Sequence, residues 1–141
     1  MATYNKFQPF VEYVYKGKID FTPSTGHTFK IFLCAAANAP VATNGLLANL
    51  TTASTANLDT TTVVVGTAAQ TSGTLTVLFN DLTVTSTGGT TGPFRYVGIY
   101  DDTPTSPADP LVVWYDYGSE ITLALNETFL FDFTTSTFTA T

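Results

Sequence analysis

Apolar and polar residues alternate along most of the chain, and this alternation predicts β-strands. Phe129, Phe131 and Phe133 occupy every second position of one run, so all three share one face of an extended segment. Runs rich in Val, Ile, Thr and aromatic residues between turn-forming residues also predict β-strands. We expect strands over residues 28–35, 60–67, 74–85, 93–101, 111–117, 121–125 and 128–133, with a last short strand around Phe138.

Two of these runs also predict how the chain turns. Residues 74–85 change face at Asn80-Asp81, which indicates a bulge or bend in one long strand or a tight turn between two; we favour the bulge or bend. Asn126-Glu127 separates the last two long runs, which predicts a hairpin there. About eight short strands with such turn signals are typical of an all-β domain, a β-sandwich of jelly-roll-like or immunoglobulin-like topology.

In the first 17 residues, apolar residues recur at the three- and four-residue spacing of a helix instead. Asn5 is the expected N-terminal cap, Pro9 is tolerated only in the first turn, and Gly17 is the expected stop. A helix of about ten residues is too short to be stable alone in water. Its apolar stripe must therefore pack on the sandwich or on a neighbouring subunit, and we treat residues 1–17 as a docking segment. The stripe consists of Phe7, Phe10, Val11 and Val14.

Composition supports one folded domain over residues 1–141 and narrows the choice of partners. Hydrophobic residues make up 44% of the chain, enough for a core, whereas charged residues make up only 11%. An average domain has about 25% charged residues, so the surface here must consist largely of Thr, Ser, Asn and Gly, which suits contact with other proteins. A net charge of −6 with five basic residues argues against nucleic acid and anionic membranes as partners.

Few residues carry reactive chemistry. Cys34 is the single cysteine, so no internal disulfide can form, and its apolar surroundings predict a small buried residue. His27 is the only histidine and has no nucleophile motif beside it, and Asp116 with Glu120 is weak evidence for a catalytic carboxylate pair. We expect no active site and no cofactor. The N-terminus shows no signal-peptide core, and no run approaches the ~20 apolar residues of a membrane-spanning helix.

The loop DDTPTSPADP at residues 101–110 is the strongest candidate site. Oxygen atoms from its three aspartates could bind Ca²⁺, but their spacing matches no EF-hand. A residue before proline is biased towards extended geometry, so we favour a stiff, largely extended loop that contacts a partner chain through Pro104 and Pro107. The three aspartates are Asp101, Asp102 and Asp109.

Aromatic residues on both sides of this loop predict a second contact surface. Alternation places Phe94, Tyr96 and Tyr100 on one face of their run. With Tyr115 and Tyr117, these tyrosines could form a sugar-stacking face or a protein interface, and we assign Tyr115 and Tyr117 to an interface.

The run LVVWYDY at residues 111–117 is apolar on both faces around Trp114. One face must then meet the core. Because monomers rarely expose large apolar patches, the other face is expected to be covered by a neighbouring chain, with simple packing in this chain's own core as the alternative.

Five segments carry a resemblance to a known family. The most specific is GPFRYVGIYDDTPTSPADPLVVWYDYG at Gly92–Gly118. The others are YNKF…F-V-E at Tyr4–Glu12, APVATN at Ala39–Asn44, Q-T-S-G at Gln70–Gly73 and E-T-F at Glu127–Phe129. In this order they resemble a family of small virion-associated β-proteins from tailed bacteriophages. The resemblance spans nearly the whole chain and brings no catalytic residues with it.

This resemblance implies a structural, non-enzymatic role. We expect a head decoration (cement) protein that binds the major capsid protein on the capsid surface of virions assembled in the host cytoplasm. The resemblance also implies a homotrimer over local three-fold axes. The alternatives are a module associated with a tail, collar or fibre, and a carbohydrate- or Ca²⁺-binding β-sandwich that uses the tyrosines and aspartates.

Overall fold

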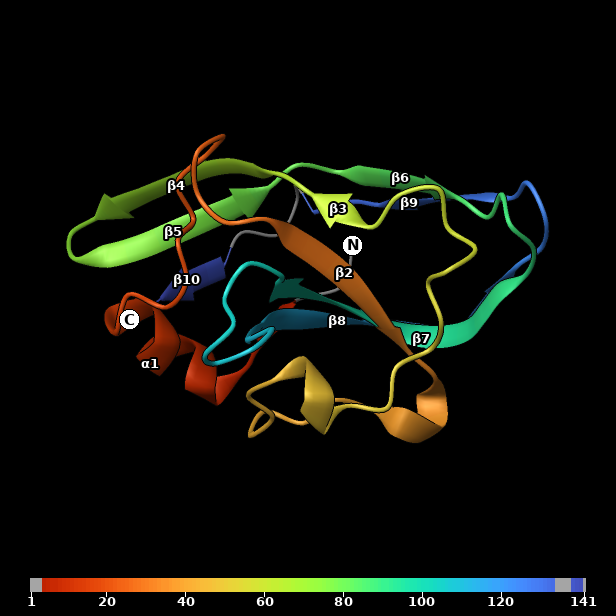
Figure 1. The fold of residues 1–141 in the computed structure, drawn as a ribbon, viewed down its shortest axis with the longest axis horizontal. Helices are drawn as coiled ribbons and strands as arrows, with labels where there is room; N and C mark the ends of the chain where they lie inside the picture. The colour runs from red at the N-terminus through yellow and green to blue at the C-terminus, as the bar shows by residue number, and fades with distance from the viewer. Residues whose placement is uncertain (1–3, 134–137, 141) are drawn as a thin grey trace.

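The computed structural model describes residues 4–133 and 138–140, which form two facing layers of antiparallel strands and one short α-helix (Figure 1). The expected all-β sandwich is confirmed. Both layers are antiparallel throughout, and the described residues contribute ten strands rather than about eight. Short 3₁₀ turns at Ala36–Asn38 and Leu47–Asn49 lie in the long connection after the second strand.

The larger layer is a five-stranded sheet in the order β1-β8-β7-β2-β3. Its strands are β1 Tyr4–Lys6, β8 Leu111–Leu123, β7 Thr91–Asp101, β2 Phe29–Cys34 and β3 Thr62–Val63. The second layer combines two small sheets that lie end to end along the top of Figure 1. One is β10-β5-β4 (Phe138–Ala140, Thr74–Phe79 and Val65–Thr71), and the other is β6-β9 (Leu82–Thr85 and Thr128–Phe131).

The predicted bend at Asn80-Asp81 is the place where the chain passes from one small sheet to the other. β5 ends at Phe79 and pairs with β4, whereas β6 begins at Leu82 and pairs with β9. The Asn80 N–H donates to the carbonyl oxygen of Val64 at 2.8 Å and holds the bend. The change of face at the bend turns both Phe79 and Val84 into the core, with 1% and 0% exposure.

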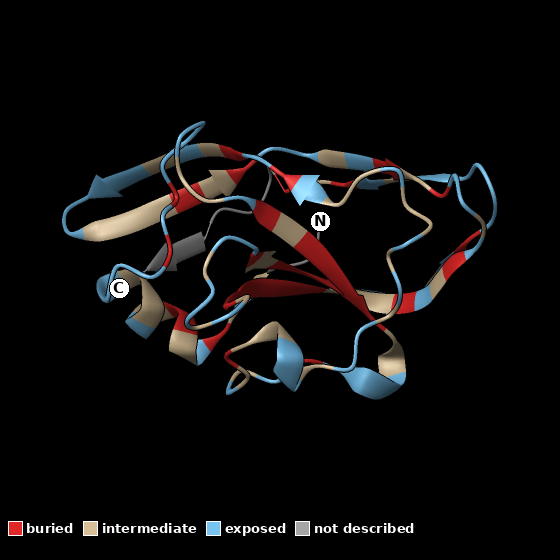
Figure 2. Cartoon of the chain, viewed as in Figure 1, coloured by how far each residue is buried: buried red, intermediate tan, exposed pale blue. Residues whose placement is uncertain are grey.

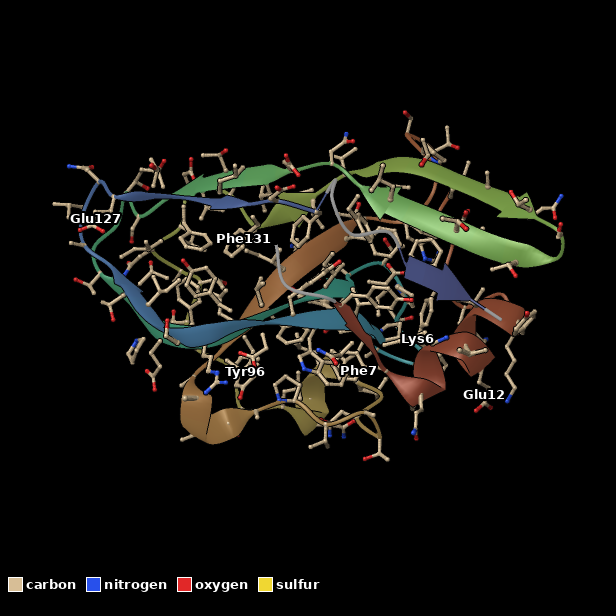
Figure 3. The ribbon with its side chains drawn as sticks, turned by 180° about the vertical axis from the view of Figure 1, so that it is seen from behind. Lys6, Phe7, Glu12, Tyr96, Glu127 and Phe131 are labelled. Atoms are coloured by element: carbon tan, nitrogen blue, oxygen red, sulfur yellow. The ribbon has the colours of Figure 1, made fainter. Side chains whose placement is uncertain are left out.

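The hairpin predicted at Asn126-Glu127 is wrong. β9 pairs with β6, not with the end of β8, so the chain crosses from one layer to the other at this turn. Backbone hydrogen bonds join the turn to Ser86: the Asn126 N–H donates to the Ser86 carbonyl oxygen, and the Ser86 N–H donates to that of Glu127. The crossing directs Phe131 into the space between the layers (Figure 3).

The helix α1, Gln8–Tyr15, has Pro9 in its first turn as predicted, and Gly17 follows its end with a left-handed φ of 69°. The predicted cap Asn5 is wrong, because Asn5 pairs with Trp114 in the β1–β8 ladder. Phe7 occupies the cap position and makes no side-chain cap hydrogen bond.

The core lies on both faces of the larger sheet. Between the layers, Phe29 of β2 packs edge-on against Phe79, with ring centroids 5.4 Å apart. On the opposite face, Phe7 packs against Trp114 at 4.4 Å and Phe32 at 6.4 Å. Figure 3 shows Phe7 and Phe131 on opposite sides of β8, and Figure 2 shows the buried residues concentrated in the central strands.

For the second face of the strand around Trp114, core packing is therefore confirmed, and the prediction that a neighbouring chain covers this face is wrong. Trp114 is only 9% exposed and Val112 is fully buried within this chain. The N-terminal segment supplies the cover: Phe7 lies over Trp114, and the Phe7 N–H donates to the carbonyl oxygen of Val112 at 3.3 Å.

Candidate functional site

A groove of about 170 Å³ lies between β7 and β8 of the larger layer and β9 of the other layer. Its floor is fully buried and its rim is not: Tyr115 and Phe131 are 1% exposed, whereas Tyr117 is 55% and Leu130 is 54% exposed. An exposed aromatic and aliphatic rim over a closed apolar floor is the arrangement that accepts apolar groups of a ligand or partner. Most of its lining is aromatic: Phe94, Tyr115, Tyr117, Phe129 and Phe131.

The aromatic rings of the groove hold one another in place. The Phe129 ring lies 5.6 Å from that of Tyr117, 5.9 Å from that of Phe94 and 4.9 Å from that of Phe131. The Tyr117 and Phe94 contacts are edge-to-face, a favoured arrangement for aromatic pairs. The groove is thus walled by rings that lose little freedom when a partner binds.

A bulge in β8 brings Tyr117 to the rim. Tyr96 pairs with Asp116, but Phe94 pairs with Ile121, so residues 117–120 form extra chain opposite Arg95. Gly118 sits in this bulge with a φ of 96°, a conformation that favours glycine. Tyr117 lies on the same side of β8 as Tyr115, but it belongs to the bulge and is largely exposed, whereas Tyr115 is buried.

The same shift in register places Phe94 of β7 on a different face from the one predicted. Phe94 was placed with Tyr96 and Tyr100, but it is buried between the layers and contacts Phe129. Tyr96 lies on the other side of the sheet from Phe131 (Figure 3). Tyr100 faces Leu47 and Thr55 of the long connection. The four tyrosines therefore form no single face, and only Tyr115 and Tyr117 meet at the groove.

A two-pronged ion pair stands at the groove and fixes the bulge. Arg95 donates from Nε to Oδ1 of Asp116 at 2.8 Å and from Nη2 to Oδ2 at 3.0 Å. The Gly118 N–H donates to the same Oδ1 at 2.8 Å. The hydrogen bond from Arg95 lowers the pKa of Asp116 below its ordinary value, and the pair raises the pKa of Arg95. A bidentate pair of this kind fixes geometry as well as charge.

Within the predicted helical stripe, Phe7 and Phe10 are fully buried inside this chain. These two residues of the stripe therefore pack on the sandwich of their own chain. Val11 and Val14 are only half-buried. Val14 lines a wider cleft of about 480 Å³ between α1 and the β4–β5 hairpin, whose inner face contributes Ala68 and Leu75.

The 101–110 loop is anchored and turned rather than largely extended, so that part of its prediction is wrong. Asp109 adopts a left-handed φ of 48°, and Thr105 forms a bridge with Ala108 across a turn. Pro104 and Pro107 are half-buried on this turn.

The three aspartates of the loop do not converge. Asp101 contacts His27, with 2.5 Å between Oδ2 and Nδ1, whereas Asp102 pairs with Lys30 at 2.9 Å. Within residues 4–133 and 138–140, no three side chains of His, Cys, Asp or Glu gather in a way that could hold a metal ion.

The His27–Asp101 pair was not foreseen. Asp101 is fully buried at the end of β7, and His27 is partly exposed at its surface. The Thr103 N–H donates to the Asp101 carboxylate at 3.1 Å, and the Thr28 N–H donates to Thr103 Oγ1 at 2.8 Å. The pair thus ties the start of the loop to the segment before β2. The burial of Asp101 could have been predicted from the alternation along its strand, because Asp101 has the same parity as the buried Val97 and Ile99.

We expect Asp101 to make stability fall as pH rises. Burial raises the pKa of Asp101 above its ordinary 3.8, against the opposing hydrogen bond from His27. At a pH between the ordinary pKa of the unfolded chain and the raised pKa of the folded protein, the folded state binds more protons than the unfolded state. The free energy of unfolding therefore decreases as pH rises through the raised pKa. Asp101→Asn should lose this component in urea unfolding measured between acid and neutral pH.

Asp116→Asn is the control for that measurement, with the opposite sign. Arg95 lowers the pKa of Asp116, so the stability from this carboxylate is present above its ordinary pKa and lost as pH falls through the folded value. Parallel pH profiles for the native protein and Asp101→Asn would contradict the burial of Asp101.

Cys34 is confirmed as a small buried residue. It is fully buried, and burial raises the pKa of its thiol to about 11, which makes it a poor nucleophile at neutral pH. Among the described residues, no helix has the length and apolar character needed to cross a membrane.

No family model, curated protein or solved structure matches this chain. The class defined by the strands is an all-β sandwich, and it carries the aromatic groove between β8 and β9.

Proposed function

We propose that this protein is a non-enzymatic structural protein of a bacteriophage virion, a head decoration protein that binds the major capsid protein and stabilises contacts between capsomers. The observation that carries the proposal is the aromatic groove with its exposed rim of Tyr117 and Leu130. The segment with the most specific resemblance, Gly92–Gly118, forms β7, the 101–110 loop and much of β8, and so supplies two walls of this groove.

The rigidity of the groove supports a role in docking. Protein interfaces depend on a few aromatic or Arg residues that fill, or are filled by, well-packed pockets. Here Tyr117 is braced by Phe129, and the chain beside it is fixed by the Arg95–Asp116 pair. A preformed site of this kind loses little conformational entropy when an apolar side chain of the shell protein enters it.

The 101–110 loop is the second proposed contact. Its start is pinned by the His27–Asp101 pair, and Pro104 and Pro107 restrict its turn. Because the loop is already restricted, binding of the capsid protein at this loop would cost little conformational entropy. Copies crowded on a capsid lattice also benefit from a low content of charge, 11% of residues, because closely spaced like charges repel.

We expect Tyr117→Ala and Leu130→Ala each to weaken binding to capsids prepared without this protein. Loss of an aromatic contact such as that of Tyr117 typically costs about 2 kcal/mol, or roughly 30-fold in affinity, and loss of the aliphatic side chain of Leu130 should cost less. Because both side chains are more than half exposed, the stability of the free protein should change little. Binding is measured by co-sedimentation with the capsids, and the copies are located by cryo-electron microscopy.

Val41→Ala is the matched control, since Val41 is 53% exposed and lies away from the groove in the turn after the first 3₁₀ segment. It should bind as well as the native protein. Equal binding by all three variants would contradict docking through the groove. Density confined to the tail, or retention on a glycan array with no capsid binding, would instead support a tail module or a carbohydrate-binding protein.

A further inference from the structure

The β4–β5 hairpin presents a free strand edge at the opposite end of its layer from β9 (Figure 1). Among the described strands, β4 (Val65–Thr71) pairs with β5 on one side only, and it is the outermost strand of its sheet. A free edge offers a row of backbone N–H and C=O groups that can pair with another strand.

This edge lacks the usual features that prevent pairing. Proteins commonly protect such edges with charged side chains, proline or a bulge. β4 has a bulge only at its base, between Val65 and Thr67, and the regular part that follows reads TAAQT. Thr67, Ala69 and Thr71 are exposed there, and none is large enough to hold a neighbouring strand away.

The distribution of charge indicates which partner fits this edge. Residues 60–80 contain no Asp, Glu, Lys, Arg or His, although the chain as a whole carries a net charge of −6. Two copies of so acidic a chain repel each other unless they meet where neither is charged. The hairpin is such a place, whereas a cationic partner would find no carboxylate on it to bind.

We propose that a second copy of this chain pairs with the first along β4, antiparallel, about a two-fold axis close to Ala69. An antiparallel pair of identical strands is self-complementary, which is the requirement for a two-fold interface. Ala69 then lies opposite Ala69 of the second copy, and Thr67 lies opposite Thr71, as cross-strand neighbours do within a sheet. The two three-stranded sheets become one continuous sheet across the dimer.

This inference does not rest on the proposed function. It uses the hairpin at one end of the molecule and leaves the aromatic groove at the other end open to a different partner (Figure 1). It also differs from the homotrimer that the family resemblance implies, because a two-fold pair closes at two copies.

The experiment is light scattering on the full chain, with protein concentrations from micromolar to submillimolar. We expect a particle of twice the chain mass of 15.1 kDa. Ala69→Lys places two like charges near the axis and should weaken the dimer by about ten-fold or more. The matched control is Thr76→Lys, which adds the same charge directly opposite Ala69 on β5, a strand covered on both edges by β4 and β10.

A charge swap distinguishes loss of the dimer by charge repulsion from loss of the dimer by misfolding. Ala69→Lys and Ala69→Glu should each be monomeric, and their mixture should restore a particle of dimer mass. A native chain that stays monomeric at every concentration overturns the proposal. So does a stable trimer, and so does an equal loss of association in Ala69→Lys and Thr76→Lys.

Discussion

Phe10→Ala should lower the free energy of unfolding by about 3–5 kcal/mol, the usual loss when a fully buried phenylalanine is truncated. Phe10 is 0% exposed, and its ring meets that of Phe21 edge-on at 5.9 Å. Phe21 in turn stacks on Phe29 at 5.0 Å, so the helix is attached to the inter-layer core through a chain of aromatic contacts. An alanine would leave a cavity beside Phe21.

Val14→Ala on the same helix is the matched control. Val14 is half-buried beside an open cleft, so its truncation should cost about 1 kcal/mol or less. Urea unfolding of both variants provides the comparison. If Phe10→Ala unfolds at the same urea concentration as Val14→Ala and only capsid binding is lost, the helical stripe is a docking surface and not part of the core.

Gly98→Ala should destabilise the protein by about 1–3 kcal/mol through overpacking. Gly98 lies directly opposite Phe32 in the β2–β7 ladder, and the Phe32 ring covers it. A Cβ atom at position 98 would lie 2.1 Å from Cζ and 2.3 Å from Cε1 of that ring. The ring has little room to move, because Phe32 is 2% exposed and packs against Phe7.

A double-mutant cycle with Phe32→Leu tests the cause of the loss. Each single change should destabilise the protein, but the double variant should be more stable than the sum of the two losses predicts, because the smaller side chain makes room for the new methyl group. Strict additivity in urea unfolding would show that Gly98 is needed for some reason other than the Phe32 ring.

Local pattern predicted the strands well, because period-two alternation depends only on which face of a strand is buried. The alternation of Phe129, Phe131 and Phe133 was predicted correctly, as was the bend at Asn80-Asp81. Alternation does not say which edge a strand will pair with. For that reason a turn signal at Asn126 was taken for a hairpin, although the strand after it pairs with β6.

The candidate site was predicted only in part, for two physical reasons. Tyr115 and Tyr117 were named from the sequence, but their meeting with Phe94 depends on a bulge, and a bulge breaks the parity by which faces are assigned. Phe7 was assigned to docking because an apolar stripe does not reveal which surface covers it. In this chain that surface is the outer face of the larger sheet, around Trp114.

The pairing of Tyr4 with Tyr115 has a consequence for how the chain is made. A ribosome adds about 5–20 residues per second, so the first strand waits on the order of ten seconds for its partner to be synthesised. The last strand, β10, pairs with β5 and emerges later still. The β4–β5 hairpin needs only neighbouring residues, so it can form first on the nascent chain. Its uncharged edge is then open to the hairpins of adjacent chains on the same message, before either sheet is complete.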